Sequence, residues 1–186
     1  AESAFVNGDF HMLAGATPNT AMNLEKNFDV ILLENGNGAA GFGFTFDSTN
    51  PNSPFADVRV RQAVGYAIDR QAVMDTIFHG YVIPTNQWAL PALSVYNNQV
   101  EGTPYNPEKA KQLLAEAGYP NGFKTKATYI NSPDNEMMFT AVQGYLEKVG
   151  IQLELNPATV GAWVDMTSGG GWDGIVNLVF KTESDV

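Results

Sequence analysis

The last third of the chain constrains the fold most, because strand-like and helix-like segments alternate there. Residues 123–130 alternate apolar with polar side chains, which is typical of a half-buried strand, and residues 151–155 and 174–180 are two further segments with the pattern and length of strands. Helical patterns separate them, one opening at residues 132–134 and one covering residues 160–167. The order strand–helix–strand–helix–strand predicts a mainly parallel sheet with right-handed helical crossovers.

The carboxyl ends of these strands are the expected place for a ligand, as in other open sheets of this kind. Asn131 and Ser132 follow the first strand and stand at the start of a helix, whose free N–H groups suit an anion such as a peptide carboxylate. Plain capping of the helix by Ser132 explains the same residues equally well. The sequence leaves both interpretations open.

The middle of the chain is predicted to be helical, and its start richer in strands. Helices are expected from Asp57, from the capping residue Asp69 and from Asn106–Pro107. Strands are expected at residues 28–33 and 41–46. We therefore expect one α/β lobe over residues 1–186, with a strand-rich entry segment at 1–55 and helices with a βαβαβ unit at 56–186.

Charge and composition exclude several classes of partner. Ten basic and 20 acidic residues give a net charge of −10, which disfavours nucleic acid and anionic membrane surfaces. No apolar run approaches the ~20 residues of a membrane span, and there are no cysteines. Residues 1–10 lack the pattern of a signal peptide and the chain has no initiator Met, so we expect a mature or excised segment.

Motifs for catalysis or cofactors are weak. Residues 36–41, GNGAAG, match the G-x-G-x-x-G motif of dinucleotide-binding proteins, but a predicted strand follows them where that motif requires a helix. His11 and His79 show no metal-ligand spacing. We expect no enzyme activity, no cofactor and no metal.

One block carries a specific resemblance. Residues 54–63 read PFADVRVRQA and residues 67–70 read AIDR. This block resembles the signature of family 5 bacterial extracellular solute-binding proteins, which serve ABC importers of dipeptides, oligopeptides and nickel. Further similar stretches follow in the family's order, NPEKA at 106–110, LAEAGYPNGF at 114–123 and VGI at 149–151.

The resemblance covers nearly the whole chain, with some departures. Asp47 stands where the family usually has Asn, and His11 replaces a usual acid. Family members have two lobes, and this chain resembles the C-terminal lobe cut before its last elements. The resemblance implies one lobe of a type II periplasmic binding protein-like fold, a mainly parallel mixed sheet flanked by helices.

The resemblance also implies a function and partners. The expected function is capture of di- or oligopeptides in an interlobe cleft and delivery to ABC permease subunits, in the periplasm or on the cell surface as a lipoprotein. The other lobe of the same protein is an expected partner. Oligosaccharide or nickel-chelate binding, or a ligand-sensing or interaction module, remain alternatives.

Additional ligand-binding residues follow from the resemblance. Trp88 lies in a loop similar to one that lines the cleft, and packing within that loop is an equal alternative. Phe180 follows the third strand, and relatives that bind peptides carry nearby an Asp that pairs with the ligand's amino terminus. Glu183 or Asp185 is the expected counterpart. A lone lobe should bind weakly or not at all, because half of the cleft is missing.

Overall fold

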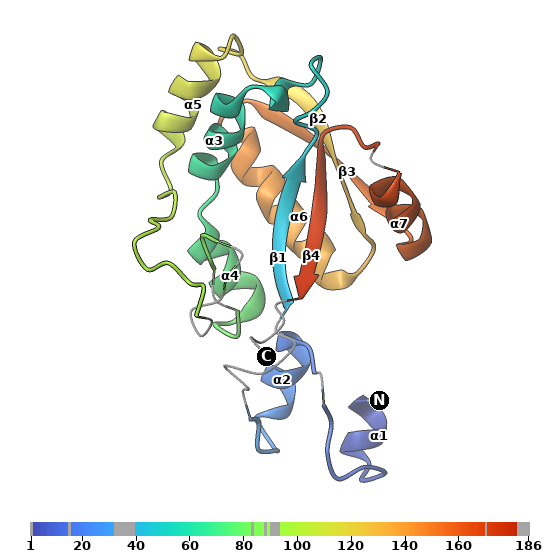
Figure 1. Ribbon diagram of the computed structural model, residues 1–186. Coiled ribbons are helices and arrows are strands. Elements are labelled where there is room, and N and C mark those ends of the chain that lie inside the picture. The colour runs from blue at the N-terminus through green and yellow to red at the C-terminus, as the bar shows by residue number, and fades with distance from the viewer. Residues whose placement is uncertain are drawn as a thin grey trace.

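A mixed sheet of four strands, β1 (Ala40–Phe46), β2 (Phe123–Ile130), β3 (Ile151–Ala158) and β4 (Ile175–Lys181), forms the centre of the molecule (Figure 1). The computed structural model describes residues 2–14, 16–31, 40–82, 84–87, 89, 94–169 and 171–181. The strand order is β1-β4-β2-β3. β2 pairs in parallel with β3 and β4, and β1 runs antiparallel to β4. The predicted mainly parallel mixed sheet is confirmed.

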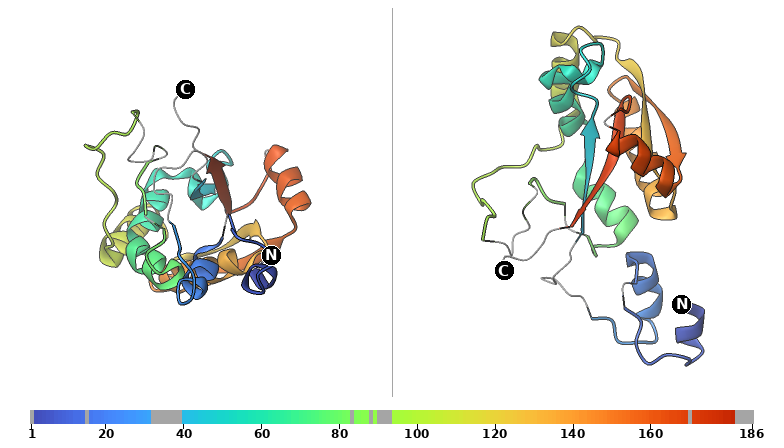
Figure 2. Two further views of the ribbon diagram at one scale, coloured as in Figure 1. Left: turned by 90° about the horizontal axis from the view of Figure 1, so that it is seen from below. Right: turned by 45° about the vertical axis from the view of Figure 1, so that its right-hand side comes forward.

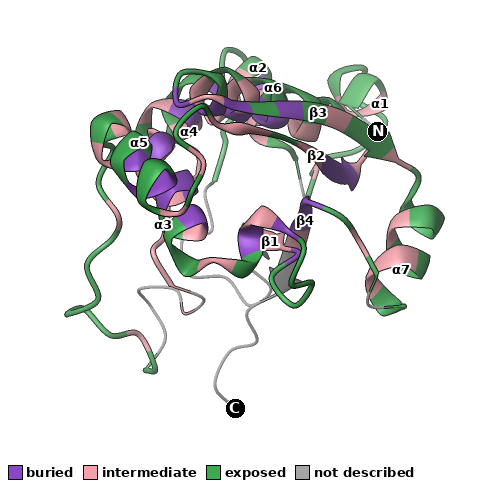
Figure 3. Ribbon diagram, turned by 90° about the horizontal axis from the view of Figure 1, so that it is seen from above, coloured by how far each residue is buried: buried purple, intermediate pink, exposed green. Residues whose placement is uncertain are grey.

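Helices flank both sides of the sheet (Figures 1 and 3). They are α3 (Val58–Ala67), α4 (Arg70–Phe78), α5 (Pro107–Glu116), α6 (Pro133–Glu147) and α7 (Val160–Ser168). α6 connects β2 to β3 and packs with α3 against the apolar face, whereas α7 connects β3 to β4 and lies on the other side. The predicted caps Asp69 and Asn106 each accept a main-chain N–H of the helix that follows, and so does Asp57 at the start of α3, as short polar side chains do at helix starts.

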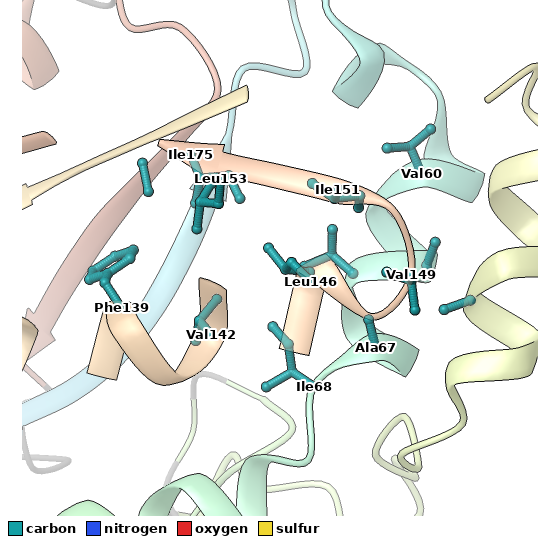
Figure 4. Packing of buried hydrophobic residues seen from close by; sticks show 14 of the residues in the cluster. Val60, Ala67, Ile68, Phe139, Val142, Leu146, Val149, Ile151, Leu153 and Ile175 are labelled. Atoms are coloured by element: carbon teal, nitrogen blue, oxygen red, sulfur yellow. The ribbon is translucent and has the colours of Figure 1, made fainter. Parts of the chain in front are cut away.

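The core lies between the sheet, α6 and α3 (Figure 4). Phe139 and Leu146 of α6 are fully buried beneath strand residues such as Ile151. The ring of Phe139 stacks on that of Tyr129 from β2, with centroids 4.3 Å apart. The buried residues of α6, which are Met138, Phe139, Val142 and Leu146, belong to this core.

The residues of the signature block (54–70) hold the turn that leads from β1 into α3. Pro54–Ala56 form a 3₁₀ turn, η1, and Phe55 is completely buried, with its ring 5.0 Å from Phe46 and 5.7 Å from Phe123. Arg61 donates to the carbonyls of Phe55 and Ala56 at 2.6 and 3.1 Å. Arg59 donates to the carbonyl of Glu116, at the end of α5, at 2.7 Å. Both arginines therefore fix the ends of neighbouring elements, because those carbonyls have no partner within a helix.

Two glycines allow the turns before β2 and β3 to touch. Gly122 has a φ of +73°, and a Cβ built on it would lie 1.9 Å from the carbonyl oxygen of Gly150. Side chains do not tolerate such an approach, so this contact requires glycine. It sets the register in which Phe123 faces Ile151 at the start of the parallel pair.

The start of the chain differs from the expected strand-rich segment. Residues 2–31 carry two short helices, α1 (Glu2–Val6) and α2 (Pro18–Leu24), and project beyond the sheet (Figure 2). No strand covers residues 28–31 of the predicted strand at 28–33, and residues 32 and 33 lie outside the described residues. The ring of Phe28 packs on that of Phe5 from α1, with ring centroids 4.7 Å apart. A strand needs a neighbouring strand, and an apolar run alone does not supply one.

Candidate ligand-binding edge

The carboxyl ends of β2, β3 and β4 meet at one edge of the sheet, called here the carboxyl edge. β2 runs directly into α6 and β3 into α7, so two helices start there on opposite sides of the sheet. α2 lies next to this edge, since the side-chain amide of Asn19 donates to Asp134 in the first turn of α6 at 3.3 Å. Residues from distant parts of the sequence therefore surround the loop at Asn131 and Ser132.

The structure shows Ser132 acting as a helix cap. Its Oγ accepts the N–H of Asn135 at 3.3 Å, and its main-chain carbonyl accepts the N–H of Glu136 at 2.9 Å. Pro133 has no N–H to offer. Asn131 continues the pairing with β3 through its main-chain N–H, which donates to Ala158 at 2.9 Å, and the residue is exposed to solvent.

The charge of the α6 start is negative. Asp134 and Glu136 both lie in its first turn, where their negative charges interact favourably with the positive end of the helix dipole. Tyr129 donates to Glu136 at 2.5 Å, and burial, with help from this bond, raises the pKa of Tyr129 above its usual range. A ligand carboxylate approaching this helix start therefore meets two carboxylates of the protein.

A hollow of about 330 Å³ lies between α2 and the end of α4. Its lining residues are Met22, Glu25, His79, Gly80 and Tyr81. The Tyr81 hydroxyl donates to Glu25, and this bond raises the pKa of Tyr81. This hollow carries no signal in the sequence, because Glu25 and Tyr81, which meet there, are 56 positions apart in the chain.

The structure brings together only part of the predicted ligand set. Asn131 and Ser132 lie side by side at the carboxyl edge. Phe180 belongs to β4, where its backbone pairs with Gly41. Trp88, Glu183 and Asp185 lie outside the described residues. The roles of these residues stay predictions.

Two features are absent from the described part of the chain. Within these residues, no three or more His, Asp or Glu side chains gather in a way that would hold a metal ion. None of the helices in the same ranges combines the length and apolar character needed to cross a membrane.

Comparison with known proteins identifies the family. The profile described as "Bacterial extracellular solute-binding proteins, family 5 Middle" matches residues 1–182. Heme-binding protein A of Haemophilus influenzae is 37% identical over 118 residues, which cover 61% of this chain and 21% of that protein. Glutathione-binding protein GsiB of Escherichia coli is 36% identical over 109 residues, covering 58% of this chain and 21% of that protein.

A solved structure extends the similarity to the whole fold. The periplasmic binding protein DppA of Helicobacter pylori, in complex with the peptide STSA, aligns with a TM-score of 0.79 at 24% identity. The alignment covers 98% of this chain and 35% of DppA. This chain thus spans about a fifth of the length of these curated relatives and about a third of this solved protein. With its profile match, its sheet order and its signature block, the chain belongs to family 5 of the bacterial extracellular solute-binding proteins, which bind solutes and are not enzymes.

Proposed function

We propose that this chain supplies one lobe of a protein that captures di- or oligopeptides in an interlobe cleft and hands them to an ABC permease. The carboxyl edge is the wall of the cleft on this lobe. The observation that carries the proposal is the polar loop at Asn131 and Ser132, in which Asn131 is exposed and which leads into the helix start that α2 contacts through Asn19. Loops at the carboxyl ends of parallel strands are where such sheets bind ligands.

The proposed ligand residues are Trp88, Asn131, Ser132, Phe180, Glu183 and Asp185. The carboxylates at the start of α6 favour an amino or amide group of the peptide at this point over its carboxylate. The same acidic end would suit the amino terminus that Glu183 or Asp185 is proposed to bind. The protein would work in the periplasm, or on the cell surface as a lipoprotein.

The mechanism we propose is closure of two lobes about the peptide. A ligand shifts an equilibrium between open and closed forms only if it binds the closed form more tightly. It must therefore contact both lobes, and this lobe alone offers only part of the contacts. Weak binding by the isolated chain follows from that requirement.

The test is a thermal-shift screen of the 186-residue chain beside a longer protein that contains both lobes. The ligands are dipeptides, tetrapeptides, glutathione, heme, nickel chelates and oligosaccharides. A species that binds only the native state raises the melting temperature. We expect peptides to stabilise the longer protein and to leave the isolated chain almost unchanged.

Two outcomes would overturn the proposal. A shift of the longer protein with heme, chelate or sugar and not with peptides would assign another ligand class. A strong shift of the isolated chain with peptide would contradict the two-lobe mechanism.

A further inference from the structure

The last residue of β2, Ile130, is held by two asparagine side chains. The ladder between β2 and β4 comprises the pairs Ala127–Ile175 and Thr128–Val176. Beyond it, the N–H of Ile130 donates to the side-chain oxygen of Asn177 at 3.2 Å. The carbonyl of Ile130 accepts the side-chain amide of Asn135 at 2.6 Å.

The main chain of Asn177 is used by a third side chain. Its carbonyl accepts the indole N–H of Trp163, from α7, at 3.2 Å. A longer parallel ladder would join main-chain groups of β2 and β4 at this level. Instead, the Ile130 N–H donates to the side chain of Asn177, and the Asn177 carbonyl accepts from the side chain of Trp163. The ladder therefore ends before the carboxyl edge, and both main-chain groups still have a hydrogen-bond partner.

Asn177 is an unusual residue for its position. It is fully buried, and its side-chain N–H₂ group has no hydrogen-bond partner among the described residues. A buried donor without a partner is unfavourable, whereas an apolar side chain of similar size would avoid that cost. What asparagine adds is an acceptor for Ile130.

We propose that Asn177 is a positioning residue for ligand capture. Its side-chain carbonyl fixes the end of β2, and through Ile130 it fixes the adjoining loop of Asn131 and Ser132. Asn177 does not touch the ligand, because it is completely buried. The inference rests on the proposed function in one respect, namely that the loop of Asn131 and Ser132 contacts a bound peptide.

The first experiment compares Asn177→Leu with Trp163→Phe by amide hydrogen exchange in the 186-residue chain. Leucine removes the acceptor, so we expect exchange at Ile130 to accelerate about five- to tenfold relative to Ala127 in the same strand. Phenylalanine removes only the indole bond to the main-chain carbonyl of Asn177, leaves the side-chain acceptor in place, and should keep that ratio within about twofold. Equal effects of both variants, or an unchanged Ile130 in Asn177→Leu, would refute the positioning role.

A second measurement covers the case in which Asn177→Leu does not fold. A scalar coupling across the hydrogen bond, between the Ile130 amide nitrogen and the side-chain carbonyl carbon of Asn177, is expected in the unsubstituted chain. Its absence would overturn the proposal.

The third measurement separates this inference from the proposed function. In the longer protein, Asn177→Leu should raise the dissociation constant of trialanine about threefold or more, and Trp163→Phe should not. If the unsubstituted protein ignores peptides, the proposed function fails while the exchange result still decides the role of Asn177. If peptides bind the unsubstituted protein and both variants equally well, the positioning role of Asn177 is refuted and the proposed function stands.

Discussion

The signature block and the carboxyl edge are built in different ways. In the block, Phe55 is fully buried among aromatic rings and two arginines bind main-chain carbonyls. At the edge, exposed Asn131 adjoins a helix start, and α2 is attached through polar bonds such as Asn19–Asp134. The residues that resemble the family signature thus build the scaffold, and those proposed to meet the ligand lie elsewhere.

This difference has a consequence for assigning ligands. A scaffold of buried contacts tolerates few substitutions, because interiors are close-packed. A polar edge tolerates many, since surface changes alter stability little. Similarity in the signature block therefore identifies the family and leaves the ligand open, in line with relatives that are named for heme and for glutathione.

The largest expected effect comes from closing the glycine contact on the scaffold side. Gly122→Ala places a Cβ 1.9 Å from the Gly150 oxygen, at a positive φ. We therefore expect the free energy of unfolding to fall by more than about 4 kcal/mol, or the chain not to fold. Urea unfolding measures it. Gly144→Ala is the matched control, because a Cβ there meets nothing within 4 Å and should stabilise α6 by about 0.5–1 kcal/mol. Similar results for both would contradict the close approach.

The next effect tests the aromatic packing of the signature block. Phe55→Ala empties a fully buried site and should lower the free energy of unfolding by about 3–5 kcal/mol. Phe10→Ala, at a residue that is 51% exposed, should change it by less than about 0.5 kcal/mol. Chemical denaturation of both variants decides, and a mild effect at Phe55 would refute its role as an anchor.

A smaller effect compares the helix cap at the carboxyl edge with an equivalent cap outside that edge, at the start of α5. Asn106→Ala and Ser132→Ala each remove an acceptor for a helix N–H and should each cost about 1 kcal/mol. Only Ser132→Ala should also reduce the thermal shift of the longer protein with peptide. Equal peptide responses in both variants would leave Ser132 as a cap alone.

The smallest effect is a pH dependence in the signature block. Hydrogen bonds from the side chain and main chain of Arg59 hold the pKa of Asp57 at about 2, below its usual 3.8. Because the folded pKa is the lower one, the stabilisation is complete above about pH 4 and is lost as the pH falls through 2. Asp57→Asn should lower the melting temperature by about 2 °C or less at pH 7, since exposed pairs contribute little.

The measurement for Asp57 is a series of melting curves from pH 7 to pH 2. The difference between Asp57→Asn and the unsubstituted chain should shrink toward zero at the acid end. A constant difference across that range would show that the carboxylate charge is irrelevant there.

Most elements of the lobe could be predicted from sequence, because their signals are local. Caps such as Ser132 and the alternation of β2 each act within one element. The two helices before residue 25 were missed, although Thr17 caps α2 and Pro18 opens it. Their short length gave the apolar periodicity too few residues to be recognised.

The sequence by itself determined the family, the order of strands and helices from β1 onward, and the position of Asn131 and Ser132 at the end of a strand. Only the tertiary structure decided what surrounds them. The contact of Tyr81 with Glu25 and the bond from Ile130 to Asn177 join residues 56 and 47 positions apart. Such contacts depend on how whole elements pack, because each residue's local pattern is equally compatible with other partners.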